Sequence, residues 1–352
     1  MRPLRVNPDW TSPPPTGTVS ARFLCPERLE IRRPAEVLDP LHFVDLPEIV
    51  LKALGGTAVR FPAHFVAKLE GARVFSHHGV IISADNRIFD DLTHEFRDFQ
   101  LGNRICHYAG LPEIERLDAR VLVIPTISSW KNYFHWMVDA VPRLRTIAPD
   151  EYDYVYTPLS RPYHRAALEA LGIPESKWLE AKADTHLAVT ELIVPNYPTP
   201  GHPTPEAVQF VRQGFHLPPQ KGAGRRLYIS RGDAWRRRVR NEQALMDLLE
   251  PLGFEMITMD GLDVPAQAEL FSTIDFVISP HGAALTNLIF SPPGTKVLEC
   301  YPSDFIYPHF YRLSAAAGHT YSAHTSHCEP EDPDFDLDLE SFAPCVHRLL
   351  DA

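Results

Sequence analysis

The chain has few cysteines and no long apolar run, and each shortage excludes a class of protein. The five cysteines are scattered and none has CxxC spacing. This argues against a disulfide framework or a zinc site and is typical of reduced thiols in a cytosolic protein. No apolar run approaches the roughly 20 residues that a membrane-spanning helix needs. The first residues also lack the apolar region of a secretory signal.

Positive charge is also in short supply. The net charge of −11 argues against a general nucleic-acid binder. We therefore expect a cytoplasmic protein with no nucleic-acid partner and no transmembrane segment. Peripheral membrane association and the oligomeric state stay open.

Familiar catalytic signatures are absent, namely GxSxG, the Walker GxxxxGK[ST], HExxH and GxGxxG. A DxD-like run at 334–338 lies in an acidic terminal segment with no strand before it, so we expect a solvated face. A group of residues near the C-terminus matches no usual zinc spacing and is interpreted as surface or packing residues of a loop: His319, His324, His327 and Cys328. No metal ligand is therefore predicted.

The charge is unevenly distributed along a chain of otherwise ordinary globular composition. Its 352 residues are 44% hydrophobic and 22% charged, which allows two domains of normal size. Residues 225–240 carry seven arginines and one aspartate, whereas the rest of the chain is strongly acidic. A basic island in an acidic protein predicts an anionic ligand of limited size.

The order of apolar runs predicts an α/β protein with antiparallel structure near its N-terminus. Short β-type runs with hairpin signals occupy residues 61–96. The second half alternates strand and helix at short intervals, which predicts a doubly wound parallel sheet. A proline-rich connection at 196–205 marks the domain boundary. The predicted parts are an extended arm, an N-terminal domain, a C-terminal domain and an acidic segment with a terminal helix: residues 1–20, 21–200, 201–330 and 331–352.

One stretch, Phe276–Cys300, predicts a strand–loop–helix–turn–strand unit. Its loop lies at the carboxyl end of the first strand, where α/β folds bind ligands. Gly282 and Ala283 allow a ligand to approach the backbone N–H groups of a helix start, which attracts anions. This indicates a phosphate-bearing ligand; an ordinary tight turn is the alternative.

Arg231 follows one predicted strand and Glu299 ends another, so both lie at the carboxyl edge of the predicted sheet. A guanidinium at that edge can bind a diphosphate through two parallel hydrogen bonds. The alternative for most of the arginines at 236–240 is a solvated charge run. Glu299 can accept hydrogen bonds from a ribose diol, or it is a carboxylate in water.

His135 and Asp139 are four residues apart on a predicted helix and therefore share one face. Such a pair suits general-base catalysis, because the carboxylate orients the imidazole and raises its basicity. A capping or buried histidine beside a surface aspartate is the alternative. Pro142 is expected to end or kink the helix near Ala140 or Val141. Three neighbouring aromatic residues form either core or a stacking wall for a sugar ring or base: Tyr133, Phe134 and Trp136.

Three segments in this order resemble the catalytic domain of glycosyltransferase family 61, also called DUF563: Asn132–Leu144, Leu227–Glu242 and Phe276–Glu299. The family includes plant xylosyl- and arabinosyltransferases and bacterial proteins linked to capsular or exopolysaccharide synthesis. The resemblance implies a GT-B fold, with two Rossmann-like domains facing across a cleft. It also implies inversion at the anomeric carbon, no obligatory metal and a nucleotide-sugar co-substrate, for which a UDP-sugar is expected.

The resemblance also assigns roles by position. The C-terminal domain would bind the nucleotide-sugar, and the N-terminal domain would take the glycan (or protein) acceptor. His135 and Asp139 fall in the family's H-W-x-x-[DE] segment and become candidates for the acceptor-activating base, with the choice between them open. The residues implied for the donor are Arg231, Arg236, His281, Gly282 and Ala283 for the diphosphate, Thr286 and Asn287 for phosphate or ribose, and Glu299 for the ribose.

We therefore expect an inverting glycosyltransferase of bacterial polysaccharide synthesis. Two alternatives on the same fold stay open. One is a non-catalytic nucleotide-sugar-binding or scaffold protein, and the other is a GT-B-type nucleotide-sugar epimerase.

Overall fold

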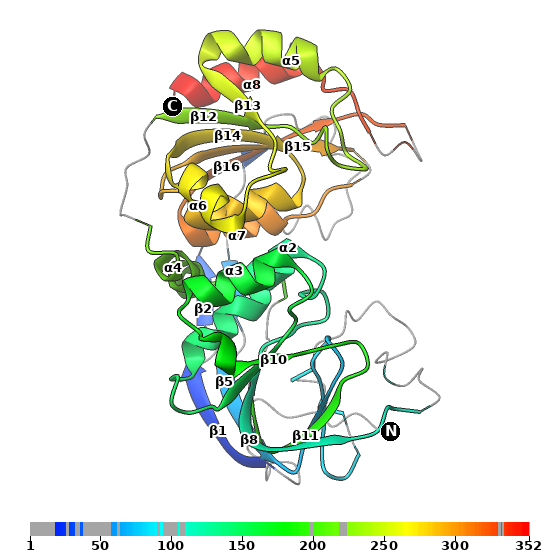
Figure 1. Cartoon of the computed structure of the whole chain (residues 1–352). Coiled ribbons are helices and arrows are strands. Elements are labelled where there is room, and N and C mark those ends of the chain that lie inside the picture. The colour runs from blue at the N-terminus through cyan, green and yellow to red at the C-terminus, as the bar shows by residue number, and fades with distance from the viewer. Residues whose placement is uncertain are drawn as a thin grey trace. The chain divides into compact units, whose positions relative to one another are not determined.

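The computed structural model describes residues 18–25, 28–31, 36–37, 58–61, 64–86, 88–89, 92–93, 105, 110–196, 200–217, 224–303, 305–329, 332 and 334–351. The chain divides into two compact units (Figure 1). Unit 1 comprises Met1–Glu30 and Arg60–Pro203, and unit 2 comprises Ile31–Val59 and Thr204–Ala352. Most of the expected arm at residues 1–20 lies outside the described residues, and the assignment of chemistry to each domain stays a prediction.

Unit 1 is built on a mixed eight-stranded sheet of order β1-β5-β11-β8-β9-β10, with β6 beside β11 and β7 beside β6. The strands β8 to β11 pair in parallel, whereas the pairs β1–β5, β5–β11, β6–β11 and β6–β7 are antiparallel. The bounds are β1 (Thr18–Cys25), β5 (His64–Glu70), β6 (Arg73–Phe75), β7 (Val80–Ile82), β8 (Glu115–Val123), β9 (Tyr154–Thr157), β10 (Trp178–Glu180) and β11 (His186–Pro195). A separate two-stranded pair joins β2 (Arg28–Ile31) and β4 (Ala58–Phe61).

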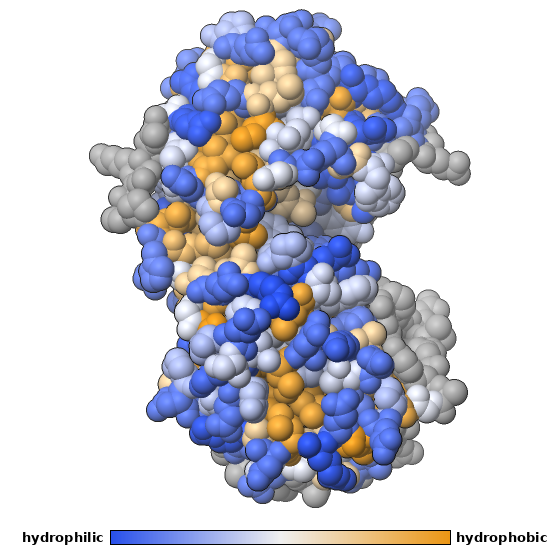
Figure 2. All heavy atoms as spheres, viewed as in Figure 1, coloured by the Kyte–Doolittle hydropathy of each residue, from blue (hydrophilic) through white to orange (hydrophobic). Residues whose placement is uncertain are grey.

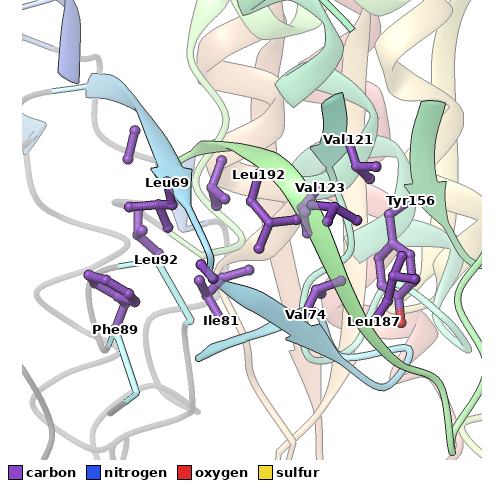
Figure 3. Close-up of a cluster of buried hydrophobic side chains, with 14 of the residues drawn as sticks. Leu69, Val74, Ile81, Phe89, Leu92, Val121, Val123, Tyr156, Leu187 and Leu192 are labelled. Atoms are coloured by element: carbon purple, nitrogen blue, oxygen red, sulfur yellow. The ribbon is translucent and has the colours of Figure 1, made fainter. Parts of the chain in front are cut away.

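The core of unit 1 lies on the face of this sheet where β5, β8 and β11 meet (Figure 3). Val121 and Val123 of β8 pack there with Leu192 of β11 and Leu69 of β5, all within 1% of full burial. β8 begins with polar, exposed residues and ends in a buried apolar run, Val121–Val123. Burying these branched side chains contributes about 1.5–3 kcal/mol each, and it fixes the edge from which the following helical segment starts.

The helical segment that follows β8 changes its pitch twice. A single turn of α-helix, α2 (Tyr133–His135), passes into a π-helical stretch, η3 (Trp136–Ala140), and then a 3₁₀ stretch, η4 (Val141–Thr146). Pro142 has no N–H, so it cannot donate to the carbonyl four residues earlier. The N–H of Val141 instead reaches back to Trp136, five residues earlier. The predicted break near Ala140 is confirmed. Unit 1 also contains α3 (Pro162–Ala170) and η5 (Glu175–Lys177).

Unit 2 is built on a sheet of six parallel strands in the order β13-β12-β14-β15-β16-β3. The bounds are β3 (Glu36–Val37), β12 (Arg225–Ile229), β13 (Phe254–Ile257), β14 (Ile274–Pro280), β15 (Lys296–Pro302) and β16 (Thr320–Ser326). Apart from β3, the order along the chain is 2-1-3-4-5, which is flavodoxin-like. The strand order therefore reverses between β12 and β14, and such a switch point is where open α/β sheets bind ligands. The predicted α/β class is confirmed.

Helices cover both faces of this sheet (Figure 1). Leu245 and Leu249 of α5 share one buried cluster with Val346 and Leu349 of α8. On the other face α4, α6 and α7 contact η7. The outward side of α5 is hydrophilic (Figure 2), as expected for a helix that buries one stripe. The bounds are α4 (Pro205–Gly214), α5 (Glu242–Leu249), η6 (Glu250–Leu252), α6 (Val264–Ser272), η7 (Ala283–Phe290), α7 (His309–Ala317) and α8 (Leu339–Asp351).

The loop predicted around residues 319–328 is wrong for most of that stretch, because β16 occupies Thr320–Ser326. His324 lies in β16 with no exposed surface, whereas His319, His327 and Cys328 flank the strand. β16 reads TYSAHTS and lacks the apolar run that predicts a buried strand. It is buried because β15 and β3 pair with its edges and because α7 and α8 contact it. Across the described part of the chain, every helix is too short or too polar to cross a bilayer.

Candidate functional site

Two motifs that lie far apart in the sequence meet at the switch point of unit 2. Arg231 follows β12 and Gly282 follows β14. The Arg231 guanidinium packs so closely on Gly282 that a Cβ at position 282 would lie 2.9 Å from the guanidinium carbon. A side chain at 282 would therefore push Arg231 away, and glycine is needed for this close approach.

Arg231 is held by the backbone of its own loop. Its Nη2 donates to the carbonyl of Arg236 at 3.0 Å, and burial lowers the pKa of its guanidinium. Among the residues that the structure describes, Arg231 takes part in no ion pair, although the charge of Asp233 acts on it. A partly buried cation without an ion-pair partner is a ready site for an anion.

The other arginines of the loop divide into two groups. Arg237 Nε donates to the carbonyl of His281 at 2.9 Å, and its guanidinium lies 4.5 Å from the centre of the Phe305 ring. Arg236 lies over Phe305 and Trp235 at 5.2 and 4.5 Å. These contacts connect the arginine loop, residues 231–240, to the loops after β14 and β15. Phe305 was not among the residues predicted from sequence, and its position just after a parallel strand was the available signal.

The remaining two arginines are ion-paired by an acidic strap, residues 334–338. Asp334 accepts from Arg238 N at 2.9 Å and Nε at 2.8 Å, and Asp336 accepts from Arg240 at 3.0 Å. Burial alone would raise the pKa of Asp334, but the hydrogen bonds from Arg238 lower it overall. Asp334 is buried, as are the strap's Phe335 and Leu337. The prediction of a solvated acidic face is wrong for Asp334, whereas Asp336 and Asp338 are exposed. Arg238 and Arg240 are exposed as expected for a solvated charge run, but both are ion-paired.

A buried histidine–carboxylate pair lies beside Gly282. Nδ1 of His281 donates to Oε1 of Glu299 at 2.5 Å, and the Tyr321 hydroxyl donates to Oε2 at 2.6 Å. Burial, together with the Glu299 charge, raises the pKa of Tyr321 far above its ordinary value, so Tyr321 remains a neutral donor. Glu299 has no exposed surface, and both of its oxygens contact protein groups. The geometry thus gives Glu299 partners other than the ribose that the resemblance implied.

The residues at the start of η7 differ in accessibility. Ala283 is exposed directly after Gly282, whereas Thr286 and Asn287 have no exposed surface. Asn287 Nδ2 donates to Gln267 Oε1 at 2.6 Å, and no hydrogen-bond partner is found for Thr286 Oγ1 among the described residues. Of these residues, Ala283 is exposed and Arg231 is half-buried, whereas Gly282, Thr286 and Asn287 are buried.

The second candidate site lies in unit 1 on the π-helical segment. His135 Nδ1 donates to Asp139 Oδ2 at 2.6 Å, and Gly201 N donates to Asp139 Oδ1 at 3.0 Å. The side chains of His135 and Asp139 are 12% and 2% exposed. Asn132 caps the segment by accepting from Phe134 N at 3.0 Å. The predicted pairing is present, with the histidine the more accessible partner. π-helical turns within helices are frequent at functional sites.

The aromatic neighbours of this pair belong to the core. Trp136 is fully buried, and its Nε1 donates to the carbonyl of Tyr163 at 3.1 Å. Phe134 is also buried, and burial raises the pKa of Tyr133 well above its ordinary value. Of the two sequence interpretations, core packing therefore holds for Trp136 and Phe134.

Arg143 was not singled out from the sequence. It is buried, and its guanidinium donates to the carbonyls of Ile124, Pro125 and Pro195 at the ends of β8 and β11. It ties the helical segment to the sheet edge. Its place in the resembling segment was the available signal. Within the described residues, no three His, Cys, Asp or Glu side chains are grouped to hold a metal ion.

Comparison with known proteins agrees with these motifs. The family model Glycosyltransferase 61 matches residues 133–298, which include the His135–Asp139 pair, Arg231 and Gly282. The chain is also similar to the β-1,2-xylosyltransferase XAX1 of Oryza sativa subsp. japonica, with 36% identity over 91 residues. That match covers 25% of this chain and 16% of the rice protein. The resemblance to glycosyltransferase family 61 is confirmed.

Proposed function

We propose, from the premise that residues 133–298 match glycosyltransferase 61, that the chain transfers a sugar from a nucleotide-sugar to a hydroxyl of a glycan (or protein) acceptor. The observation that carries the proposal is the contact of Arg231 with Gly282 at the switch point of a parallel sheet. The proposal includes inversion at the anomeric carbon and a UDP-sugar donor. A GT-B architecture, a cytoplasmic location and a role in bacterial polysaccharide synthesis rest on the resemblance.

In the proposed donor site, positive groups meet the charge that grows on the leaving diphosphate. Arg231 and the N–H groups at Gly282 and Ala283 bind its oxygens, and Arg236 adds a second guanidinium. Each preorganised donor lowers the barrier by roughly 3 kcal/mol. Because guanidinium groups supply the charge, the proposal requires no divalent metal. Full activity after EDTA treatment is the expected result.

His281 is proposed to contact the same diphosphate, oriented by Glu299. With Nδ1 committed to Glu299, Nε2 is the ring nitrogen that remains for a phosphate oxygen. We therefore assign Glu299 to positioning His281 rather than to binding ribose. Tyr321 supports this role because it holds the second oxygen of the same carboxylate.

His135 is proposed as the acceptor-activating base, with Asp139 as its orienting partner. Both oxygens of Asp139 are engaged within unit 1, and its side chain is less exposed than that of His135. His135 takes the proton of the acceptor hydroxyl while the hydroxyl oxygen attacks the anomeric carbon. The bond from that carbon to the diphosphate breaks on the opposite side, and the nucleoside diphosphate departs with the electron pair.

The proposal is tested by calorimetry on the full chain with nucleoside diphosphates and nucleotide-sugars, followed by mass analysis of acceptor products. Arg231→Ala and Gly282→Ala should each weaken nucleoside diphosphate binding about tenfold or more, because both remove the Arg231 contact. Arg225→Ala is the matched control, since Arg225 opens the same strand and pairs with Glu255 on the surface.

Three results would contradict the proposal. Undiminished binding by Arg231→Ala would remove the diphosphate assignment. A nucleotide-sugar that binds but is never hydrolysed or transferred would favour the binding or scaffold protein. A free nucleotide-sugar product with a changed sugar would favour the epimerase.

A further inference from the structure

Trp235 is the most exposed large hydrophobic side chain in the described part of the chain. Its side chain is 76% exposed, against 54% for Met256 and 48% for Tyr307. An exposed indole leaves a large apolar face in water, and exposed aromatic side chains recur at recognition sites. Trp235 lies in the arginine loop, only four residues after Arg231.

The loop holds Trp235 close to the anion site. The N–H of Ala234 donates to the carbonyl of Arg231 at 2.9 Å, which closes a turn just before Trp235. The carbonyl of Arg236, just after it, accepts from the Arg231 guanidinium. Trp235 is therefore bracketed by two bonds to the residue that packs on Gly282.

The indole ring of Trp235 lies against the Arg236 guanidinium and remains largely exposed. The Arg236 guanidinium lies 4.5 Å from the ring centre, a cation–π distance, and also 5.2 Å from the Phe305 ring. Arg236 thus fixes the indole relative to the loop after β15. The large exposed fraction of Trp235 leaves a flat surface for a second planar group.

The charge of Asp233 indicates which part of a nucleotide lies over this loop. Asp233 is exposed, two residues before Trp235, and its carboxylate acts on Arg231. A carboxylate repels phosphate but accepts hydrogen bonds from a ribose diol. The nucleoside half of a ligand fits beside Asp233 better than the diphosphate half does.

We infer that Trp235 is the stacking surface for the base of the nucleotide, with Asp233 facing the ribose. This inference rests on the proposed function and adds a nucleoside subsite to it. Stacking tolerates different bases because every base offers a π face. The subsite therefore supplies affinity for a nucleoside without selecting strongly among UDP, GDP and ADP.

The test uses the full chain, three nucleoside diphosphates (UDP, GDP and ADP) and inorganic pyrophosphate. Trp235→Leu should weaken the Kd of the tightest nucleoside diphosphate about tenfold. It should leave the Kd of pyrophosphate unchanged, and Trp235→Phe should restore most of the lost affinity. The nucleotide should also quench tryptophan fluorescence in the parent, and the quench should be lost in Trp235→Leu. Met256→Ala, which changes another exposed apolar side chain of unit 2, should match the parent.

The outcomes separate this inference from the proposed function. Equal nucleotide Kd values for the parent and Trp235→Leu would overturn the stacking role while leaving the diphosphate site intact. A loss confined to nucleotide-sugars, with nucleoside diphosphates unaffected, would put the sugar ring on Trp235 and overturn the base assignment. Failure of the parent to bind any nucleotide or pyrophosphate would remove both proposals.

Discussion

Each unit has a histidine–carboxylate pair at its candidate site, and these two pairs are built alike but set in different surroundings. The Nδ1–oxygen distances are 2.6 Å for His135–Asp139 and 2.5 Å for His281–Glu299. In both, the second carboxylate oxygen accepts from another protein donor, Gly201 N or the Tyr321 hydroxyl. The shared geometry orients the imidazole and does not by itself decide what the imidazole does.

The surroundings distinguish the two pairs. His281 adjoins the arginine loop, because its carbonyl accepts from Arg237, and its ring stacks on Tyr301 at 5.2 Å. His135 lies on an irregular helical segment beside the buried Phe134, with Asn132 capping the start. An imidazole beside guanidinium groups suits an anionic leaving group, whereas one beside a buried aromatic ring suits a neutral hydroxyl. The role of a histidine–carboxylate pair is therefore inferred from the groups that surround it.

The largest expected effect separates the two histidines. His135→Ala should lower turnover about 10²- to 10⁴-fold, the usual contribution of a general base, and leave the Kd of nucleoside diphosphates unchanged. His281→Ala should weaken that Kd. Steady-state kinetics and calorimetry on the same preparations measure both. The comparison is contradicted if His135→Ala transfers sugar at the parental rate. It is also contradicted if His135→Ala, rather than His281→Ala, loses affinity for nucleoside diphosphates.

A smaller effect is expected from the carboxylates, which act through the histidines. Asp139→Asn should reduce kcat about 10²-fold or more with little change in KM for the donor, because an amide favours the wrong imidazole tautomer. Glu299→Gln should raise the donor KM about tenfold, since it disturbs His281 at the diphosphate. Asp153→Asn, an exposed partner of Arg120, is the control. Equal effects on kcat and KM in both variants would show a general loss of structure instead of two separate roles.

The smallest expected effect concerns the acidic strap and depends on pH. The pKa of Asp334 is lowered in the folded chain, so its ion pair stabilises the fold fully above the ordinary aspartate value of about 3.9. That stabilisation is lost as the pH falls through the lowered folded pKa. Asp334→Asn should therefore reduce the free energy of unfolding at pH 7 by about 1–2 kcal/mol, a value discounted because Arg238 is half exposed.

Urea unfolding at pH 7 and at successively lower pH values checks this dependence. The difference between the parent and Asp334→Asn should shrink as the pH falls below about 4. Asp336→Asn is the matched control, because that carboxylate is 62% exposed and water screens its pairing with Arg240. A difference that stays constant with pH would rule out the ion pair as its source.

Local features of both pairs could be predicted from sequence. The spacing of His135 and Asp139 places them on one helical face, and Pro142 predicts the change of helical pitch beside it. The strand before Gly282 and the strand before Arg231 both read as apolar runs, so their meeting at one sheet edge follows from parallel topology. These inferences need only a few neighbouring residues each.

Features that depend on distant residues could not be predicted in this way. The hydrogen-bond partners of Glu299 are His281 and Tyr321, which come from different parts of the chain. Asp334 and Arg238 form an ion pair although they lie 96 positions apart in the sequence. The sequence around Asp334 contains no sign of this partner, so its acidic composition predicted a solvated run. The change to π-helical pitch at Trp136–Ala140 also has no signal in the spacing of the apolar residues.

The acidic strap has a consequence for selectivity among anions. Arg238 and Arg240 already pair with carboxylates, so they are less available to the phosphates of a longer polyanion. The arginine loop then presents only part of its charge to an incoming ligand, with Arg231 nearest to Gly282. At the proposed donor site, Arg231 remains for a short diphosphate, whereas the charges of Arg238 and Arg240 are already neutralised toward a longer polyanion such as a nucleic-acid backbone.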